Sequence, residues 1–324
     1  MAMNKKRLVT KCDMDGLACG ILLKELDLID RIVLAHPKDI ESGRIAIGSD
    51  DITAGLPYKE AAHLAFDHYP GARAAKGRCD NLIVDSTMPS TSRVISNHYN
   101  QGGNLRISKD LLDAVDKGFS ADISIDEILY PTGWILLSYL IDQRTGLDLF
   151  GQFEITIEQL IEELIDIGRE RNIWEILKYP AVEERLHLYF ASMERFKGQL
   201  LRCSTVHYNL VVTDLRNEAV QYPGNRFLIY ALFPECNVSM SLLNDSTGGR
   251  TSFVAGKSIL DRSLAKDIGK IMRVHGGGGH SNAGTCMLDS EHADALNLRL
   301  INELKYSTFE NIFQGYFNCY SGYY

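Results

Sequence analysis

The sequence lacks any apolar run close to the roughly 18 residues that a membrane-spanning helix needs. The basic residues at positions 5–7 lead into a short apolar run and then charged residues, not into the apolar core of a signal peptide. The seven cysteines show neither the spacing of a zinc knuckle nor that of a redox pair, so we predict reduced thiols. These absences predict a cytoplasmic protein that does not bind a membrane.

Positive charge is also scarce. The 324 residues include 34 Lys and Arg against 42 Asp and Glu, which gives a formal net charge of -8. Nonspecific binding to long nucleic acid depends on many Lys and Arg contacts with phosphates, so this balance argues against a long duplex as the partner. A short oligonucleotide or another phosphorylated small molecule, held by a local site, is compatible with it.

Short apolar runs alternate with helical or polar segments in the first part of the chain. The runs, several of them rich in β-branched residues, are residues 7–10, 31–36, 45–48, 63–66 and 81–84. This alternation predicts a mainly parallel α/β sheet.

The apolar period becomes helical from about residue 104 to residue 200. Over 155–169, one helix face carries Ile157, Leu160, Ile161, Leu164 and Ile165. Further strand-like runs follow at 207–212, 226–233, 238–243 and 283–288, with a helix over 259–273. We therefore predict the fold class α/β, in two domains. Residues 1–200 form a mainly parallel sheet domain with a helical connector, and residues 207–324 form a second, smaller α/β domain.

Acidic residues follow three of the predicted strands. Asp13 and Asp15 come after the first strand, Asp67 and His68 after the fourth, and Asp85 after the fifth. An Asp-x-Asp pair alone is more often a capped turn. The carboxyl ends of strands in an open sheet meet at one crevice, however, and a divalent cation relieves the repulsion between carboxylates gathered there. Mixed carboxylate and imidazole ligands favour manganese, which would activate water for attack on phosphorus.

The most unusual string in the chain is His275-Gly276-Gly277-Gly278-Gly279-His280. Glycine loses the most backbone freedom on folding, so four in a row indicate either a flexible linker or close approach of a ligand to the backbone. The string lies between a predicted helix and a predicted strand, which favours a ligand. Successive N–H groups can bind an anion, and we predict that His280 and Arg262 add donors for a phosphate.

Several of these motifs together resemble one family. The segments Cys12-Asp13-Met14-Asp15-Gly16, Phe66-Asp67-His68-Tyr69 and His275 to Gly284 are similar, in order and position, to the signature elements of DHH-family phosphoesterases with a C-terminal DHH-associated domain. The family includes oligoribonucleases and exopolyphosphatases. The resemblance implies a manganese-dependent hydrolase of phosphodiester or phosphoanhydride bonds in short oligonucleotides, nucleotide phosphates or polyphosphate.

The resemblance also implies roles for single residues. Asp13 and Asp15 would bind different metal ions, and His68 and Asp85 would join Asp15 at the second ion. Asp67 would orient these ligands, and Tyr69 stands where the family has a substrate-contacting histidine. Arg93, in the segment after Asp85, would contact the substrate.

Three positions depart from the family pattern. Lys11 stands near the place of a metal-binding histidine, Gly55 stands in place of a metal-bridging aspartate, and Tyr69 replaces a histidine. The first ion would keep Asp13 alone, so we predict one Mn2+ ion rather than two, with Mg2+ as the alternative. The sequence leaves open a catalytically degenerate protein that binds phosphorylated ligands without hydrolysis, and it is compatible with a homo-oligomer.

Overall fold

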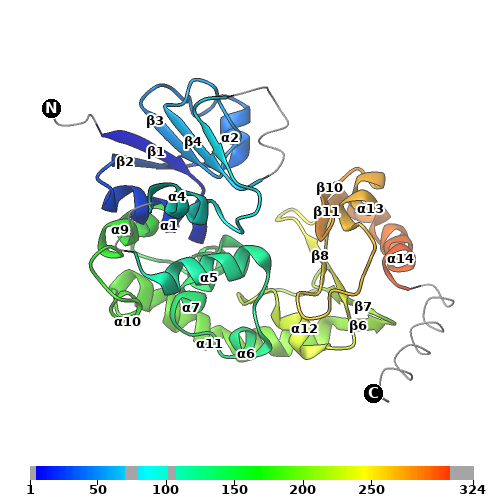
Figure 1. Ribbon diagram of the computed structural model, residues 1–324. Helices are drawn as coiled ribbons and strands as arrows, with labels where there is room; N and C mark the ends of the chain where they lie inside the picture. The colour runs from blue at the N-terminus through cyan, green and yellow to red at the C-terminus, as the bar shows by residue number, and fades with distance from the viewer. Residues whose placement is uncertain (1–4, 70–78, 101–106, 307–324) are drawn as a thin grey trace, which may run out of the picture. The chain divides into compact units, whose positions relative to one another are not determined.

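The computed structural model describes residues 5–69, 79–100 and 107–306 (Figure 1). The chain forms two compact units. The first comprises residues 1–123 and 130–191, and the second comprises residues 124–129 and 192–324. The helix α11 (Pro180–Cys203) contains residues of both units, and the predicted domain boundary lies near its C-terminal end.

The first unit contains a five-stranded sheet with the order β2-β1-β3-β4-β5, and every pairing in it is parallel. This confirms the predicted fold class. The strands are β1 (Lys6–Thr10), β2 (Ile29–Leu34), β3 (Asp51–Ala54), β4 (Leu64–Asp67) and β5 (Leu82–Val84).

Each face of this sheet buries a separate set of apolar side chains, because successive strand residues point to opposite faces. Leu8 lies in a buried cluster with side chains of α1 (Met14–Glu25), α4 (Thr91–Tyr99) and α5 (Lys109–Ser120). Its neighbour Val9 packs on the other side, with Ile40 of α2 (Pro37–Glu41). Figure 1 shows α1 and α4 on one side of the sheet and α2 on the other.

The prediction of a strand at 45–48 is wrong. That segment is a loop, and the strand lies at Asp51–Ala54. Ile45 and Ile47 pack against the cluster around Val9, so their apolar character reflects burial of a loop. The true strand begins at Asp51, whose carboxylate is held by Arg7 at 2.6 and 2.8 Å.

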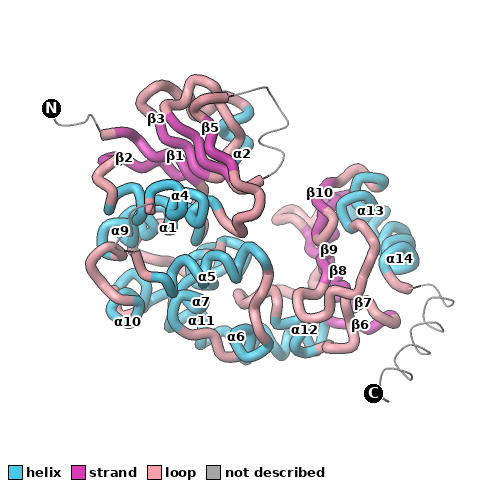
Figure 2. Tube along the Cα trace, in the orientation of Figure 1, coloured by secondary structure: helices cyan, strands magenta, loops and turns pink. Residues whose placement is uncertain are grey.

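Further helices follow α4 and α5 along the chain (Figure 2). They are α6 (Ile125–Leu129), α7 (Gly133–Ile141), α8 (Leu147–Phe150), α9 (Ile157–Ile167), α10 (Ile173–Ile176) and α11. The predicted helix within 155–169 is confirmed as α9. All five residues of its predicted apolar face are buried.

The second unit contains a six-stranded mixed sheet with the order β10-β11-β9-β8-β7-β6, in which only the β7 and β8 pairing is parallel. The strands are β6 (Ser204–His207), β7 (Leu210–Asp214), β8 (Val238–Asn244), β9 (Arg250–Lys257), β10 (Gly278–His280) and β11 (Ala283–Asp289). The helices are α12 (Leu228–Leu232), α13 (Ile268–Val274) and α14 (Ala293–Leu304). Alternate residues of β8, β9 and β11 pack against α13 and α14 to form one core.

Two predictions for this unit are wrong. Residues 226–233, predicted as a strand, contain the helix α12, because a short apolar run does not by itself distinguish a strand from a buried helix. The predicted helix at 259–273 is shorter and begins at Ile268. Within the described residues, no helix combines the length and the apolar character needed to cross a membrane.

Candidate functional site

The parallel pairing brings the predicted acidic positions to one edge of the first sheet. Thr10 pairs with Ala54, Ala54 with Phe66, and Asp67 with Val84. The residues that follow these strands, from Lys11 to Asp15 on one side and His68 and Asp85 on the other, therefore emerge at the same carboxyl edge.

Asp13 caps the helix α1. One carboxylate oxygen accepts a hydrogen bond from the N–H of Gly16 at 2.9 Å, and the other lies 3.8 Å from Lys11 Nζ. Loss of water around the carboxylate raises the pKa of Asp13, the ammonium of Lys11 opposes this, and the charge of Asp15 adds to it. Asp13 thus lies in an acidic environment that Lys11 partly neutralises.

Asp15 is almost completely buried, with 1% of its surface exposed. Its two carboxylate oxygens accept hydrogen bonds from the N–H groups of Ser92 at 2.8 Å and Thr91 at 3.1 Å. These N–H groups belong to the first turn of α4, which carries a partial positive charge and has no acceptors within the helix for them. Asp15 therefore joins the N-terminal ends of α1 and α4, a role that no motif in the sequence indicates.

Asp67 and His68 lie at the end of β4 and are both buried. The Asp67 carboxylate accepts hydrogen bonds from the N–H groups of His68 at 2.7 Å and Tyr69 at 3.0 Å, so it holds the turn in shape. Burial raises the pKa of Asp67, and these N–H groups oppose the shift.

The imidazole of His68 is held on three sides. Its Nδ1 lies 2.9 Å from Thr91 Oγ1. The centre of its ring lies 5.5 Å from the centre of the Phe119 ring and 4.5 Å from that of the Tyr69 ring. Burial lowers the pKa of His68, so the ring is neutral at pH 7. A neutral imidazole is the form that accepts a proton or binds a metal. No motif in the sequence points to Phe119, which comes from α5.

Tyr69 and Asp85 are the more accessible members of the site. Tyr69 has 55% of its surface exposed. Asp85 accepts hydrogen bonds from the N–H of Thr87 at 3.0 Å and from its hydroxyl at 2.6 Å.

Lys11 and Gly55 lie against each other. Gly55 adopts a φ of +65°, and a Cβ atom at this position would lie 3.1 Å from Lys11 Cε and 3.5 Å from Lys11 Nζ. The Lys11 ammonium also lies 5.4 Å from the centre of the Phe119 ring. A side chain at position 55 would thus begin in close contact with the end of the lysine side chain.

The glycine string in the second unit is built into the fold. The N–H groups of Gly276 and Gly277 donate to the carbonyl oxygens of Arg273 and Met272, at 3.1 and 2.9 Å, and so end the helix α13. Residues 278–280 then pair with β11 as the strand β10. The predicted phosphate site therefore depends on the backbone of Gly278 and Gly279 and on the exposed His280.

Comparison with known proteins shows which family the chain belongs to. The chain matches no family model and no curated protein sequence. Among solved structures it is similar to PggH, a pGpG-specific phosphodiesterase from Vibrio cholerae. The two are 44% identical with a TM-score of 0.84, over 93% of this chain and 99% of PggH. The chain belongs to the DHH family of phosphoesterases.

A second solved structure shares the DHH-family fold at low identity. It is RecJ from Thermus thermophilus in complex with Mn2+, with a TM-score of 0.51 and 14% identity, over 92% of this chain and 52% of RecJ.

The acidic edge does not fit the two-ion centre that the DHH resemblance implies. Across the described ranges, 5–69, 79–100 and 107–306, no group of three or more His, Cys, Asp and Glu side chains is arranged to hold a metal ion. The Lys11 side chain lies in the space beside Gly55. Metal binding by Asp13, Asp15, His68 and Asp85 therefore stays a prediction.

The two predicted phosphate-binding arginines make contacts within the protein. Arg93 donates to Asp116 at 2.7 Å and to Asp113 at 2.8 Å, so its charge joins α4 to α5. Arg262 Nε donates to the carbonyl oxygen of Ile259 at 3.4 Å. Their contact with substrate also stays a prediction, and for Arg93 it would require sharing these carboxylates.

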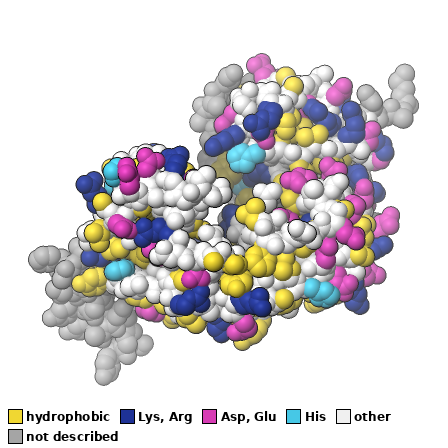
Figure 3. Space-filling view, turned by 180° about the vertical axis from the view of Figure 1, so that it is seen from behind, with side chains coloured by type: hydrophobic (Ala, Val, Ile, Leu, Met, Phe, Trp, Pro, Cys, Tyr) yellow, Lys and Arg dark blue, Asp and Glu magenta, His cyan; other side chains and the backbone are white. Residues whose placement is uncertain are grey.

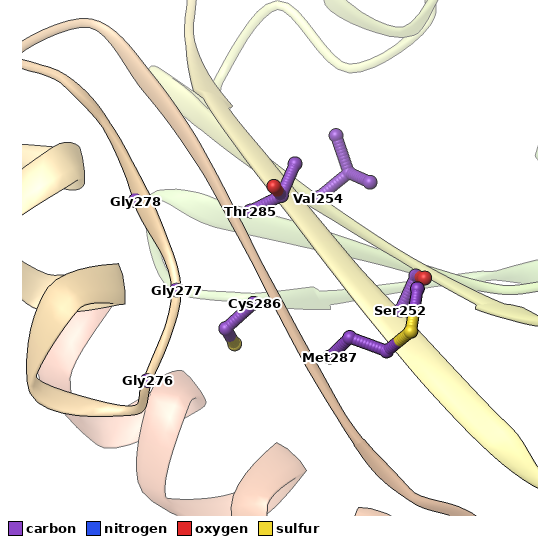
Figure 4. A pocket seen from close by; sticks show the side chains of 8 residues that line it. All are labelled: Ser252, Val254, Gly276, Gly277, Gly278, Thr285, Cys286 and Met287. Carbon is purple, nitrogen blue, oxygen red and sulfur yellow. The ribbon is translucent and has the colours of Figure 1, made fainter. Parts of the chain in front are cut away.

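An open pocket of about 300 Å³ lies beside the glycine string. Figure 4 shows the backbone of Gly276, Gly277 and Gly278 along one side, with Thr285 and Met287 of β11 and Ser252 and Val254 of β9 along the other. The hydroxyls, apolar groups and exposed backbone of this pocket suit part of a small ligand.

Alanine at two neighbouring glycines should show which of them the packing of the second unit requires. A Cβ at Gly277 would lie 2.0 Å from the carbonyl oxygen of Thr285, whereas a Cβ at Gly278 would meet no atom within 4 Å. We expect Gly277→Ala to lower the free energy of unfolding by about 2–3 kcal/mol, and Gly278→Ala to change it by less than about 0.5 kcal/mol. Urea unfolding measures both, and equal stabilities would contradict the packing explanation.

Proposed function

We propose that this protein hydrolyses the phosphodiester bond of pGpG or a similarly short oligonucleotide. One water molecule is consumed, and two mononucleotides are released from a dinucleotide. The observation that carries the proposal is the 44% identity to a pGpG-specific phosphodiesterase over nearly the full length of both chains. Binding without hydrolysis has less support, because this relative is itself named as a phosphodiesterase.

The charge of the molecule supports a short substrate. The formal net charge is -8. On the described residues of the face seen in Figure 3, Lys and Arg side chains are interspersed with Asp and Glu instead of gathering into one basic surface. A long nucleic acid would need a continuous basic path, whereas a dinucleotide needs only a local contact with its phosphates.

The residues at the carboxyl edge suit phosphodiester hydrolysis in several ways. Lys11 places positive charge beside Asp13, and its ammonium can donate to a phosphate oxygen. The neutral ring of His68 can bind a metal ion, with Thr91 fixing the orientation of the ring through Nδ1. Asp67 fixes the turn that carries His68.

We propose that hydrolysis also requires a divalent ion, one Mn2+ per chain, with Mg2+ as the alternative. The complex of RecJ with Mn2+ supports this choice for the fold. Asp15, His68 and Asp85 would hold the ion after rearrangement of their side chains, and a bound divalent ion lowers the pKa of water. The scattered thiols further support a cytoplasmic protein.

Tyr69 should bind a base of the substrate. Its ring is 55% exposed beside His68, and stacking of a base on an aromatic ring contributes about 1–3 kcal/mol. We expect Tyr69→Ala to raise KM for pGpG about 5–100-fold, and Tyr69→Phe to keep KM within about 3-fold because the stacking face remains. Steady-state kinetics with both variants test this. A large increase of KM in Tyr69→Phe would show that the hydroxyl, and not the stacking face, binds the substrate.

A panel of substrates tests the proposed function. Purified protein with Mn2+ is assayed with pGpG, pApA, a six-nucleotide RNA, bis(p-nitrophenyl) phosphate and polyphosphate. We expect kcat/KM to be highest for the dinucleotides and expect hydrolysis to stop when EDTA is added. Faster hydrolysis of polyphosphate than of the dinucleotides would indicate that the protein cleaves phosphoanhydride bonds, as other members of the family do.

A further inference from the structure

Lys11 occupies a specific position at the acidic edge. It is the first residue after β1, and its side chain is 20% exposed. The ammonium lies 3.8 Å from Asp13 Oδ2 and 5.4 Å from the centre of the Phe119 ring. It therefore lies between a carboxylate and an aromatic face, both of which favour a cation.

Lys11 lies beside the glycine at position 55. Thr10 pairs with Ala54, so Lys11 and Gly55 follow paired residues on neighbouring strands. A Cβ at position 55 would lie 3.1 Å from Lys11 Cε and 3.2 Å from Thr91 Oγ1. A side chain at position 55 would thus begin in close contact with the end of the lysine side chain, and the φ of +65° also favours glycine there.

The surroundings of the ammonium indicate what it can bind. Lys11 lies beside Asp13, at the carboxyl edge from which Asp67 and His68 also emerge. A lysine ammonium has three N–H donors, and the 3.8 Å separation from Asp13 exceeds hydrogen-bond distance. The ammonium is thus placed to donate to a substrate oxygen.

We infer that Lys11 Nζ binds a phosphate oxygen of the substrate, in place of one of the two metal ions of a two-ion phosphoesterase. The inference rests on the proposed function, because it takes the ligand to be a short oligonucleotide. It makes Lys11 a substrate-contacting residue and leaves at most one ion per chain. The cation at this position is then part of the polypeptide, so chelators cannot remove it.

Binding of pGpG in EDTA tests the inference, with Lys6 as a matched control. Lys6 lies at the other end of β1, its side chain is also 20% exposed, and it pairs with Asp50 at 3.0 Å. By isothermal titration calorimetry, we expect Lys11→Met to weaken binding at least about 10-fold and Lys6→Met to change it less than about 2-fold. Equal affinities of Lys11→Met and the wild-type protein, or no binding by the wild-type protein in EDTA, would overturn the inference.

A second pair of variants keeps the test decisive if Lys11→Met does not fold. Gly55→Asp and Gly55→Asn have nearly the same shape, and both residue types tolerate a positive φ better than most. Only the aspartate would neutralise the Lys11 ammonium. We expect Gly55→Asp to bind pGpG in EDTA at least about 5-fold more weakly than Gly55→Asn, and equal binding would contradict the inference.

The same samples separate this inference from the proposed function. If the wild-type protein binds pGpG through Lys11 but releases no product with Mn2+, the proposed hydrolysis fails and the inference stands. If the wild-type protein releases product and Lys11→Met binds pGpG normally in EDTA, hydrolysis stands and the inference fails.

Discussion

Replacing His68 with alanine is expected to lower kcat/KM for pGpG at least about 100-fold, the effect of losing a ligand of the ion that activates water. The ring is buried, neutral and fixed between Thr91 and Phe119, so a replacement side chain cannot reproduce its position. Steady-state kinetics of GMP release measure the effect. Thermal unfolding of the same sample shows whether the variant is folded.

His98 provides the matched control. Its imidazole also packs edge-on against an aromatic ring, with 5.7 Å between the ring centres of His98 and Phe66. His98 itself lies in the helix α4. His98→Ala should keep kcat/KM within about 3-fold of the wild-type value, because an exposed residue away from the site contributes little. A similar loss in both variants, or retained activity in His68→Ala, would contradict the role of His68.

Replacing Asp15 with alanine is expected to lower the free energy of unfolding by about 3 kcal/mol, because two buried N–H groups lose their acceptor. These donors, from Thr91 and Ser92, start the helix α4, and the apolar cluster of the first sheet includes Val94 and Ile95 of that helix. Urea unfolding in EDTA measures the change without any contribution from a metal.

The direction of the change separates two roles for Asp15. If the residue were only a metal ligand, the metal-free alanine variant would be as stable as the wild-type protein or more stable, because a buried charge and its repulsion with Asp13 would be gone. Asp85→Ala is the control, since Asp85 is only half-buried and two of the hydrogen bonds that its carboxylate accepts come from Thr87 in the same loop. We expect the free energy of unfolding of Asp85→Ala to fall by less than about 1 kcal/mol.

The first sheet and its acidic edge could be predicted from the positions at which the strands end. Asp13, Asp67 and Asp85 each follow an apolar run, and parallel pairing necessarily brings such ends together. The apolar face of α9 was predictable for a similar reason, because five residues at helical spacing leave few alternatives. The family motifs added the order of these segments along the chain.

Contacts between distant residues were not predictable. In the sequence, Lys11 and Gly55 are two separate departures from the family pattern, and only the register of β1 with β3 shows that they lie side by side. The contacts of the Arg93 guanidinium with Asp113 and Asp116 of the helix α5 were likewise not predictable, and its contact with substrate stays a prediction. The strand β9 was missed because serine and glycine interrupt its pattern, although Thr251, Phe253 and Ala255 alternate on its buried face.

One titration tests most directly whether the protein hydrolyses pGpG with a single ion: release of GMP from pGpG measured against equivalents of Mn2+ added to metal-free protein. We expect release to begin with added Mn2+ and to reach its maximum at one equivalent per chain, because Lys11 supplies the other positive charge. No GMP at any Mn2+ concentration would contradict the proposed hydrolysis. A rise that continues to two equivalents would show that Lys11 does not replace an ion.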